Sequence, residues 1–169
     1  MISLKEIKNN IFKKENFYFL IIILVIFALD RYSKTLIIKD FNDTIFYVND
    51  FLNFDLIWNT GIGFGLLSFN SSLFYHLISG IIATVIIFLV ILGINSDKFD
   101  KISFSIIIGG ALGNFYDRIY FKAVPDFIDF HIGEFHWFVF NVADIFITIG
   151  VIIMILFESI LNEQKNEHI

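Results

Sequence analysis

Residues 72–92 read SLFYHLISGIIATVIIFLVIL and contain no Asp, Glu, Lys or Arg. A run of about 20 predominantly apolar residues, wound as an α-helix, is long enough to cross the hydrocarbon core of a bilayer. The whole chain has the same character, because 57% of its 169 residues are hydrophobic and only 17% are charged. A soluble surface needs more interspersed charge, so the stretch and the composition together predict an integral membrane protein.

Three other apolar stretches join this one, and together they predict four transmembrane helices in a single domain over residues 1–169. The predicted helices cover residues 17–38, 72–92, 102–121 and 141–161. The first follows a cationic segment, as a secretory signal does, but no pair of small residues closes it as a cleavage site, so we expect it to stay attached. Residues 45–56 alternate imperfectly in β-prone side chains, which indicates some strand structure outside the membrane. The predicted fold class is a mainly α membrane protein.

Lysine and arginine are distributed unevenly between the predicted loops. They concentrate in the N-terminal segment, in residues 93–101 and in the C-terminal tail, whereas residues 40–70 contain none and residues 122–140 contain one. Because basic loops stay on the cytoplasmic side, both termini are predicted to be cytoplasmic and the two longer loops to lie outside. Both tryptophans, Trp58 and Trp137, fall in those outer loops, where indole rings favour the headgroup level.

Several classes of function are excluded by what the sequence lacks. The net charge is −5 and the basic residues form no patch, so no nucleic-acid partner is expected. The chain has no cysteine, which excludes disulfides, thiolate metal sites and a cysteine nucleophile. The histidines form neither an HExxH motif nor a set of ligands on one helix face, so no metal and no cofactor is predicted. They are His76, His131, His136 and His168.

Polar and charged side chains gather toward one end of the predicted helices, the outer end. They are Asp30, Lys34, Asn114, Asp117, Arg118, Asp126 and Asp144. Such residues are costly within a bilayer unless they find partners or water, so each is a functional-site hypothesis. Asp30 and Lys34 share a helix face at i, i+4, either as a pair whose lysine snorkels to the interface or as a brace between the first helix and a site.

The third predicted helix carries glycines just before its polar end, in GGALGNFYDR at residues 109–118. Small residues of this kind often form a packing seam that lets a neighbouring helix approach closely. A seam does not account for Asn114 and Arg118, which share a face at i, i+4.

Two carboxylates follow, one on each side of a predicted turn. Asp126 comes directly after the third helix, and a re-entrant loop through Gly133 can return the chain to the depth of Asp144, one turn into the fourth helix. Asn141 is a plausible N-cap on the same face as Asp144. For Asp144 alone, a favourable position at a helix N-terminus is a sufficient alternative explanation.

A pair of carboxyls in a low-dielectric pocket has a specific chemical use. Because two like charges close together cannot both ionise cheaply, the pair shares one proton. The ionised carboxyl can activate water against an amide carbonyl, while the protonated carboxyl stabilises the oxyanion and later protonates the nitrogen. The acids therefore predict aspartic peptide hydrolysis. The glycine-rich turn WNTGIGFG at residues 58–65 would be a substrate cradle, a weak candidate for a phosphate loop, or a flexible connection.

Two other classes of function remain open at this point. A proton-coupled carrier also uses charged residues within the membrane, although carriers tend to show internal repeats and polar groups near the midplane. A non-catalytic scaffold would use the same polar residues only to hold its helices together.

Five blocks, in this order, resemble the lipoprotein signal peptidase (signal peptidase II) family. They are DRYSK at residues 30–34, NTGIGF at 59–64, GGALGNFYDR at 109–118, VPDFI at 124–128 and FNVAD at 140–144. The resemblance implies four transmembrane helices with a small extracytoplasmic β-sheet in the bacterial plasma membrane. It also implies an aspartic endopeptidase that removes the signal peptide of prolipoproteins just before a diacylglyceryl-modified cysteine.

The resemblance also implies roles for individual residues. Asp126 and Asp144 match the catalytic pair, whereas Asp129 matches a frequent acidic position without a catalytic role. The residues matched to substrate binding or its support are Asp30, Lys34, Asn59, Gly61, Phe64, Gly110, Asn114, Arg118, Asn141 and Ala143. The implied partners are the lipidated prolipoprotein, membrane lipids and inhibitors of the globomycin type.

Overall fold

The computed structural model describes residues 13–41, 44–61 and 72–166, which form long helices and one small sheet. The helices are α2 (Lys14–Asp40), α3 (Ser72–Asn95), α4 (Lys98–Tyr120) and α5 (Val142–Asn166). The strands are β1 (Phe46–Asn49), β2 (Leu52–Asn59), β3 (Val124–Ile132) and β4 (Phe135–Phe140). The mainly α fold class is confirmed.

Each helix differs from its predicted range by a few residues at one end or both. The apolar stretches mark the part of a helix that suits hydrocarbon, but the helical backbone continues into polar residues that the pattern does not capture. At the start of α4, for example, the Asp97 side chain accepts hydrogen bonds from the backbone N–H groups of Phe99 and Asp100. This N-cap begins the helix four residues before the predicted position at 102.

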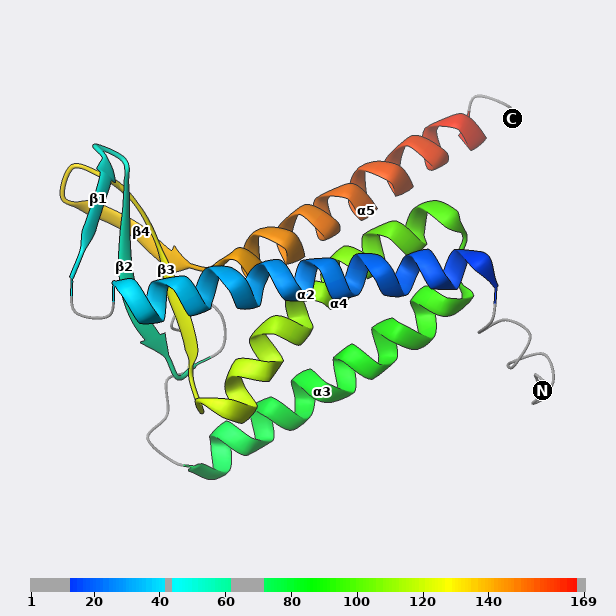
Figure 1. The fold of residues 1–169 in the computed structure, drawn as a ribbon. Helices are drawn as coiled ribbons and strands as arrows, with labels where there is room; N and C mark the ends of the chain where they lie inside the picture. Colours follow the sequence, from blue (N-terminus) through cyan, green and yellow to red (C-terminus); the bar gives the residue numbers. More distant parts are fainter. Residues whose placement is uncertain (1–12, 42–43, 62–71, 167–169) are drawn as a thin grey trace.

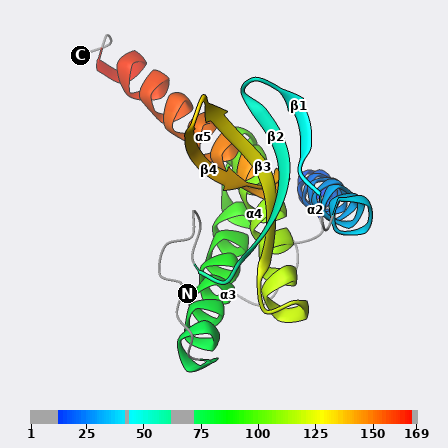
Figure 2. The same ribbon diagram turned by 90° about the vertical axis from the view of Figure 1, so that its left-hand side faces the viewer.

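Helix α4 is the centre of the bundle, since it packs against α2, α3 and α5. Its Ile108 is fully buried with Phe19 and Ile23 of α2 in the hydrophobic core. The sheet lies at one end of the helices, close to the end of α2 and the start of α5 (Figure 1). Viewed from that end, the strands cross in front of α4 and α5, and α2 lies to one side of the sheet (Figure 2).

The sheet is antiparallel throughout, with the strand order β1-β2-β3-β4. Pairing of β2 with β3 sets Asn59 opposite Val124 and Ile57 opposite Asp126, so the sheet fixes where Asp126 lies. The strand structure predicted over residues 45–56 is confirmed in β1 and β2, although β2 continues to Asn59.

The predicted re-entrant loop through Gly133 is a β-hairpin. Gly133 has φ +59°, a left-handed conformation that glycine adopts without steric cost. It lies in the tight turn that connects β3 to β4. Trp58 lies on β2 and Trp137 on β4, within the two predicted outer segments, and the position of these segments outside the membrane stays a prediction.

Among the described residues, two helices have the length and composition needed to cross a membrane, namely Tyr75–Asn95 of α3 and Val142–Ser159 of α5. Only 17% and 11% of the residues in their most apolar windows are buried, so their apolar side chains face outward. Large exposed side chains such as Phe88 and Leu156 belong to this surface. An apolar exterior of this extent fits a lipid environment. The count of four spans and the side on which the sheet lies stay predictions.

Candidate functional site

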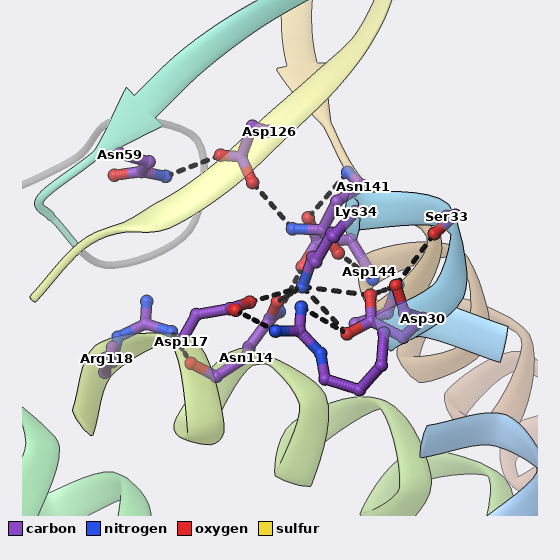
Figure 3. Close-up of polar contacts among 12 residues, drawn as sticks. Asp30, Ser33, Lys34, Asn59, Asn114, Asp117, Arg118, Asp126, Asn141 and Asp144 are labelled. Atoms are coloured by element: carbon purple, nitrogen blue, oxygen red, sulfur yellow. Dashed lines mark hydrogen bonds and ion pairs between the residues drawn. The ribbon is translucent and has the colours of Figure 1, made fainter. Parts of the chain in front are cut away.

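Lys34 of α2 is the centre of a buried polar network between α2 and α4. Its ammonium donates hydrogen bonds to Asp30 Oδ2 at 3.0 Å, Asn114 Oδ1 at 2.8 Å and Asp117 Oδ2 at 2.7 Å (Figure 3). Lys34, Asp30 and Asp117 are all fully buried. A buried ammonium persists only where acceptors replace its water, and here three acceptors do so. The brace interpretation of Asp30 and Lys34 therefore holds, and the snorkelling interpretation does not.

Lys34 also fixes the orientation of the Asn114 amide. An ammonium only donates, so the atom of Asn114 that faces Lys34 has to be the oxygen. The amide nitrogen then points to the other side, where it donates to Asp144 Oδ1 at 2.8 Å. Lys34 of α2 therefore determines that Asn114 of α4 presents an N–H donor to the Asp144 carboxylate.

Asn141 connects the two predicted catalytic acids. Its side-chain amide donates to Asp126 Oδ1 at 2.6 Å, and its backbone N–H donates to Asp144 Oδ2 at 3.1 Å. In return, the Asp144 backbone N–H donates to Asn141 Oδ1 at 3.2 Å, which completes a reciprocal cap at the start of α5. The predicted N-cap is confirmed, and it holds both acids from one residue.

Asn59, the last residue of β2, completes the surroundings of Asp126. Its amide nitrogen donates to Asp126 Oδ2 at 2.9 Å, and its amide oxygen accepts the backbone N–H of Gly61 at 2.9 Å. Arg118 of α4 donates to the carbonyl oxygens of Gly61 and Asn114, each at 3.1 Å. The start of the glycine-rich turn is thus tied both to the acid and to α4, whereas Phe64 lies outside the described residues.

Two predicted site residues, Gly110 and Ala143, act by allowing α4 and α5 to approach. A Cβ on Gly110 would lie 2.5 Å from the carbonyl oxygen of Ala143. The backbone N–H of Ala143 donates to Asp30 Oδ1 at 3.0 Å, so the start of α5 is also attached to α2. Ala143 is fully buried. These contacts hold the start of α5 against α4 and α2, and a role of Gly110, Ala143, Asp30 and Lys34 in supporting the substrate stays a prediction.

Both acids line one cavity of about 220 Å³ between α3, α4, α5 and the sheet. Its polar lining also includes Asn59, Asn114, Arg118 and Asn141, and its apolar lining is Ile82, Ala111, Val124 and Ile147. Asp144 additionally borders a second cavity of about 250 Å³, which is lined mainly by apolar side chains of β4 and α5. The cavity with the polar lining and the apolar cavity therefore both border the Asp144 carboxyl.

The surroundings of Asp126 make it a weaker acid than an exposed aspartate. Burial raises the pKa of Asp126 to about 6, and the negative charge of Asp144 acts in the same direction. The hydrogen bonds from Asn59 and Asn141 favour the carboxylate and oppose part of that rise in pKa. Two close carboxyls, one of them with a raised pKa, can hold a single proton between them.

Asp117 is one of the polar residues singled out in the sequence, but it is missing from those matched to substrate binding or its support, although the structure gives it a central place. Its carboxylate accepts from Lys34 and also pairs with Arg31, whose nitrogen NH1 lies 2.5 Å from Asp117 Oδ1. Asp117 lies three positions after Asn114 on α4, so helical spacing places the two side chains on one face. This spacing was the signal in the sequence that could have identified Asp117. A buried lysine needs several acceptors, so Lys34 could have been expected to contact Asp117 as well as Asp30.

Comparisons with known proteins agree on one family. The signal peptidase (SPase) II family matches residues 22–160. The lipoprotein signal peptidase of Pelagibacter ubique is 50% identical over 155 residues, which cover 89% of this chain and 93% of that protein. The lipoprotein signal peptidase of Francisella tularensis subsp. novicida is 41% identical over 163 residues, which cover 93% and 99% respectively.

Solved structures give the same result at the level of the fold. A bacterial membrane enzyme determined by the in meso method at 2.3 Å resolution superposes with a TM-score of 0.72 at 33% identity, covering 88% of this chain and 90% of that one. A second, at 1.9 Å resolution, superposes with a TM-score of 0.68 at 33% identity, covering 82% and 90%. The match over most of the chain and the agreement of the relatives show that this chain belongs to the signal peptidase II family.

Proposed function

We propose that this chain is an intramembrane aspartic endopeptidase of the bacterial plasma membrane. Its proposed substrates are diacylglyceryl-modified prolipoproteins, which it cleaves just before the lipidated cysteine. The observation that carries the proposal is that Asp126 and Asp144 line one cavity and share Asn141 as a hydrogen-bond donor. Membership of a peptidase family supports this reading over the proton-coupled carrier and the non-catalytic scaffold.

The proposed reaction uses the two carboxyls as one acid and one base. The ionised carboxyl takes a proton from water while the water oxygen bonds to the scissile carbonyl carbon, and the protonated carboxyl donates to the carbonyl oxygen. The tetrahedral intermediate then collapses: the C–N bond breaks, the nitrogen takes a proton from the pair, and one hydroxyl of the intermediate returns a proton to the pair. The signal peptide leaves as a carboxylic acid that ionises, the new amino terminus of the lipoprotein takes up that proton, and the pair again holds one proton.

The two cavities suit the two chemical halves of such a substrate. The cavity with both acids also contains side-chain amides and Arg118, which can hydrogen-bond a peptide backbone. The second cavity is lined by Phe138, Phe140, Ile145 and Ile149 and suits an apolar chain. We propose that the scissile bond lies beside Asp144 where the cavities meet, and that globomycin-type cyclic peptides occupy the same region.

The test is cleavage of a diacylated prolipoprotein by the purified chain, which is measured as the decrease in size from substrate to product. We expect Asp126→Asn and Asp144→Asn each to lower kcat by at least about 1,000-fold, because either change removes one proton-transfer group. Asp55→Asn, the same substitution on β2 of the same sheet, is the matched control and should retain activity.

The outcome of this assay separates the three classes of function. Turnover at the wild-type rate in either acid variant contradicts the aspartic mechanism. Proton-dependent uptake into liposomes without cleavage would support a carrier, and loss of thermal stability without loss of a defined activity would support a scaffold.

A further inference from the structure

A second cluster of titratable side chains lies on the β3–β4 hairpin, away from the two acids. Asp129 and His131 are two residues apart on β3, so their side chains point to the same face of the strand. His136 of β4 is paired directly with His131 across the hairpin. The potential ligand atoms of Asp129, His131 and His136 all lie within 4.8 Å of one another.

One member of this cluster is buried without a hydrogen-bond partner. His131 is only 9% exposed, and within the described part of the chain its Nδ1 atom makes no hydrogen bond. The same Nδ1 lies 3.6 Å from Asp129 Oδ2. A buried polar atom of this kind requires an explanation, and a ligand that accepts its lone pair is one.

His136 also directs a ring nitrogen toward the Asp129 carboxylate, next to His131. The Nδ1 atom of His136 lies 2.9 Å from each carboxylate oxygen of Asp129. The His136 side chain is 55% exposed, so this ligand can adjust its position and the site can be reached from solvent. The buried Asp129 and His131 supply the fixed half of the cluster.

The two ligand separations that involve Asp129 fit a tetrahedral metal. A zinc ion with bonds of about 2.0–2.1 Å places its ligand atoms about 3.3 Å from one another. The observed separations from Asp129, 2.9 Å to His136 and 3.6 Å to His131, lie on either side of that value. Small side-chain movements therefore convert the cluster into a coordination site.

We propose that Asp129, His131 and His136 bind a divalent first-row transition metal of the zinc class. Two imidazole nitrogens and one carboxylate are a ligand set that such ions favour, and water completes the coordination. Neither histidine lines the cavity of the two acids in the described structure, so the ion is structural. It joins β3 to β4 and steadies the strand that carries Asp126 three residues before Asp129.

The proposal is tested by metal binding to the full-length protein in detergent, purified through a tag without histidine and treated with a chelator. We expect one Zn²⁺ per chain by isothermal titration calorimetry, and a Co²⁺ complex with the visible absorption of a tetrahedral site. Added Zn²⁺ should raise the Tm, because a ligand that binds only the native state stabilises it.

Variants decide whether these residues are the ligands. His136→Ala, at an exposed position, should weaken Zn²⁺ binding by more than about tenfold and abolish the rise in Tm. His131→Ala and Asp129→Asn should do the same, whereas His76→Ala, an exposed histidine of α3, should bind like the wild type. The proposal is overturned if the wild type binds no Zn²⁺ saturably, or if the His136 and His76 variants behave alike. These binding measurements stand or fall independently of peptide cleavage.

Discussion

At the scale of single residues, the site depends on side-chain amides whose orientation is determined by their neighbours. Asn114 is oriented by Lys34, and Asn59 presents its nitrogen to Asp126 because its oxygen accepts the N–H of Gly61. Each amide therefore donates to a carboxylate, and donors stabilise the charged form. Burial opposes that effect, and at Asp126 the balance is a pKa raised to about 6.

The raised pKa of Asp126 predicts how the free energy of unfolding changes with pH. The native chain binds this proton more tightly than the unfolded chain, whose pKa is near 3.8, so stability is highest below that pH and falls as pH rises through about 6. The loss from this one group is about 3 kcal/mol above that range. Asp126→Asn removes the ionisation, so the variant should gain stability relative to the wild type between pH 4 and about pH 7.

Thermal unfolding of both proteins in the same detergent, at steps across that pH range, measures the difference. Asp55→Asn again serves as the control, since Asp55 is less buried than Asp126. A stability difference between wild type and Asp126→Asn that stays constant with pH would contradict the assignment.

At the scale of elements, the close approach of α4 and α5 positions the second acid. Gly110 faces the carbonyl oxygen of Ala143, the residue just before Asp144. We expect Gly110→Ala to force the start of α5 away from α4, lengthen the contact between Asn114 and Asp144, and lower both the Tm and kcat. The loss of stability should be about 1–3 kcal/mol, as for other overpacked interiors.

Gly80→Ala on α3 is the matched control, because apart from the adjacent backbone of α3 no atom of the described residues lies within 4 Å of the added Cβ. That change should raise stability slightly, by up to about 1 kcal/mol, since alanine is the better helix former. Thermal unfolding and the cleavage assay on both variants provide the comparison. If the two substitutions have equal effects on Tm, the contact between Gly110 and Ala143 does not position α5.

The helices could be predicted from the sequence much better than the sheet. Apolar stretches indicate helices because a helix satisfies its own backbone, whereas β3 and β4 depend on partners distant in the chain. The hairpin also explains why the histidines gave no signal. A search for ligands on one helix face passes over His131 and His136, which come together only through strand pairing.

At the scale of the whole molecule, polar residues of several elements meet in one cluster, as their positions in the predicted helices indicated (Figure 3). The sequence placed Lys34, Asn114, Asp126 and Asp144 at one level. Individual partners could not be derived in this way, because they depend on helix rotation and on the register between β2 and β3. Asp117 is the clearest omission, since its role depends on how α4 is turned toward α2.

The proposed orientation in the membrane can be tested because the chain has no cysteine. A single cysteine at Glu134 of the β3–β4 turn (Glu134→Cys) should react with a membrane-impermeant maleimide in intact spheroplasts. A cysteine at the start of α4 (Lys98→Cys) should react only after permeabilisation, since basic residues favour the cytoplasmic side. Both positions are exposed in the structure. The opposite labelling pattern would invert the topology, and labelling of both without permeabilisation would refute it.

The reciprocal cap of Asn141 and Asp144 makes proton uptake at Asp144 a mechanical event as well as a chemical one. Both of its carboxylate oxygens already receive an N–H donor, one from Asn114 and one from the Asn141 backbone. A proton on either oxygen takes up one of its lone pairs and makes that oxygen a weaker acceptor, so the N–H contact at that oxygen should lengthen. Under the proposed mechanism, protonation of Asp144 would therefore weaken either the first turn of α5 or its tether to α4, and deprotonation would strengthen it again.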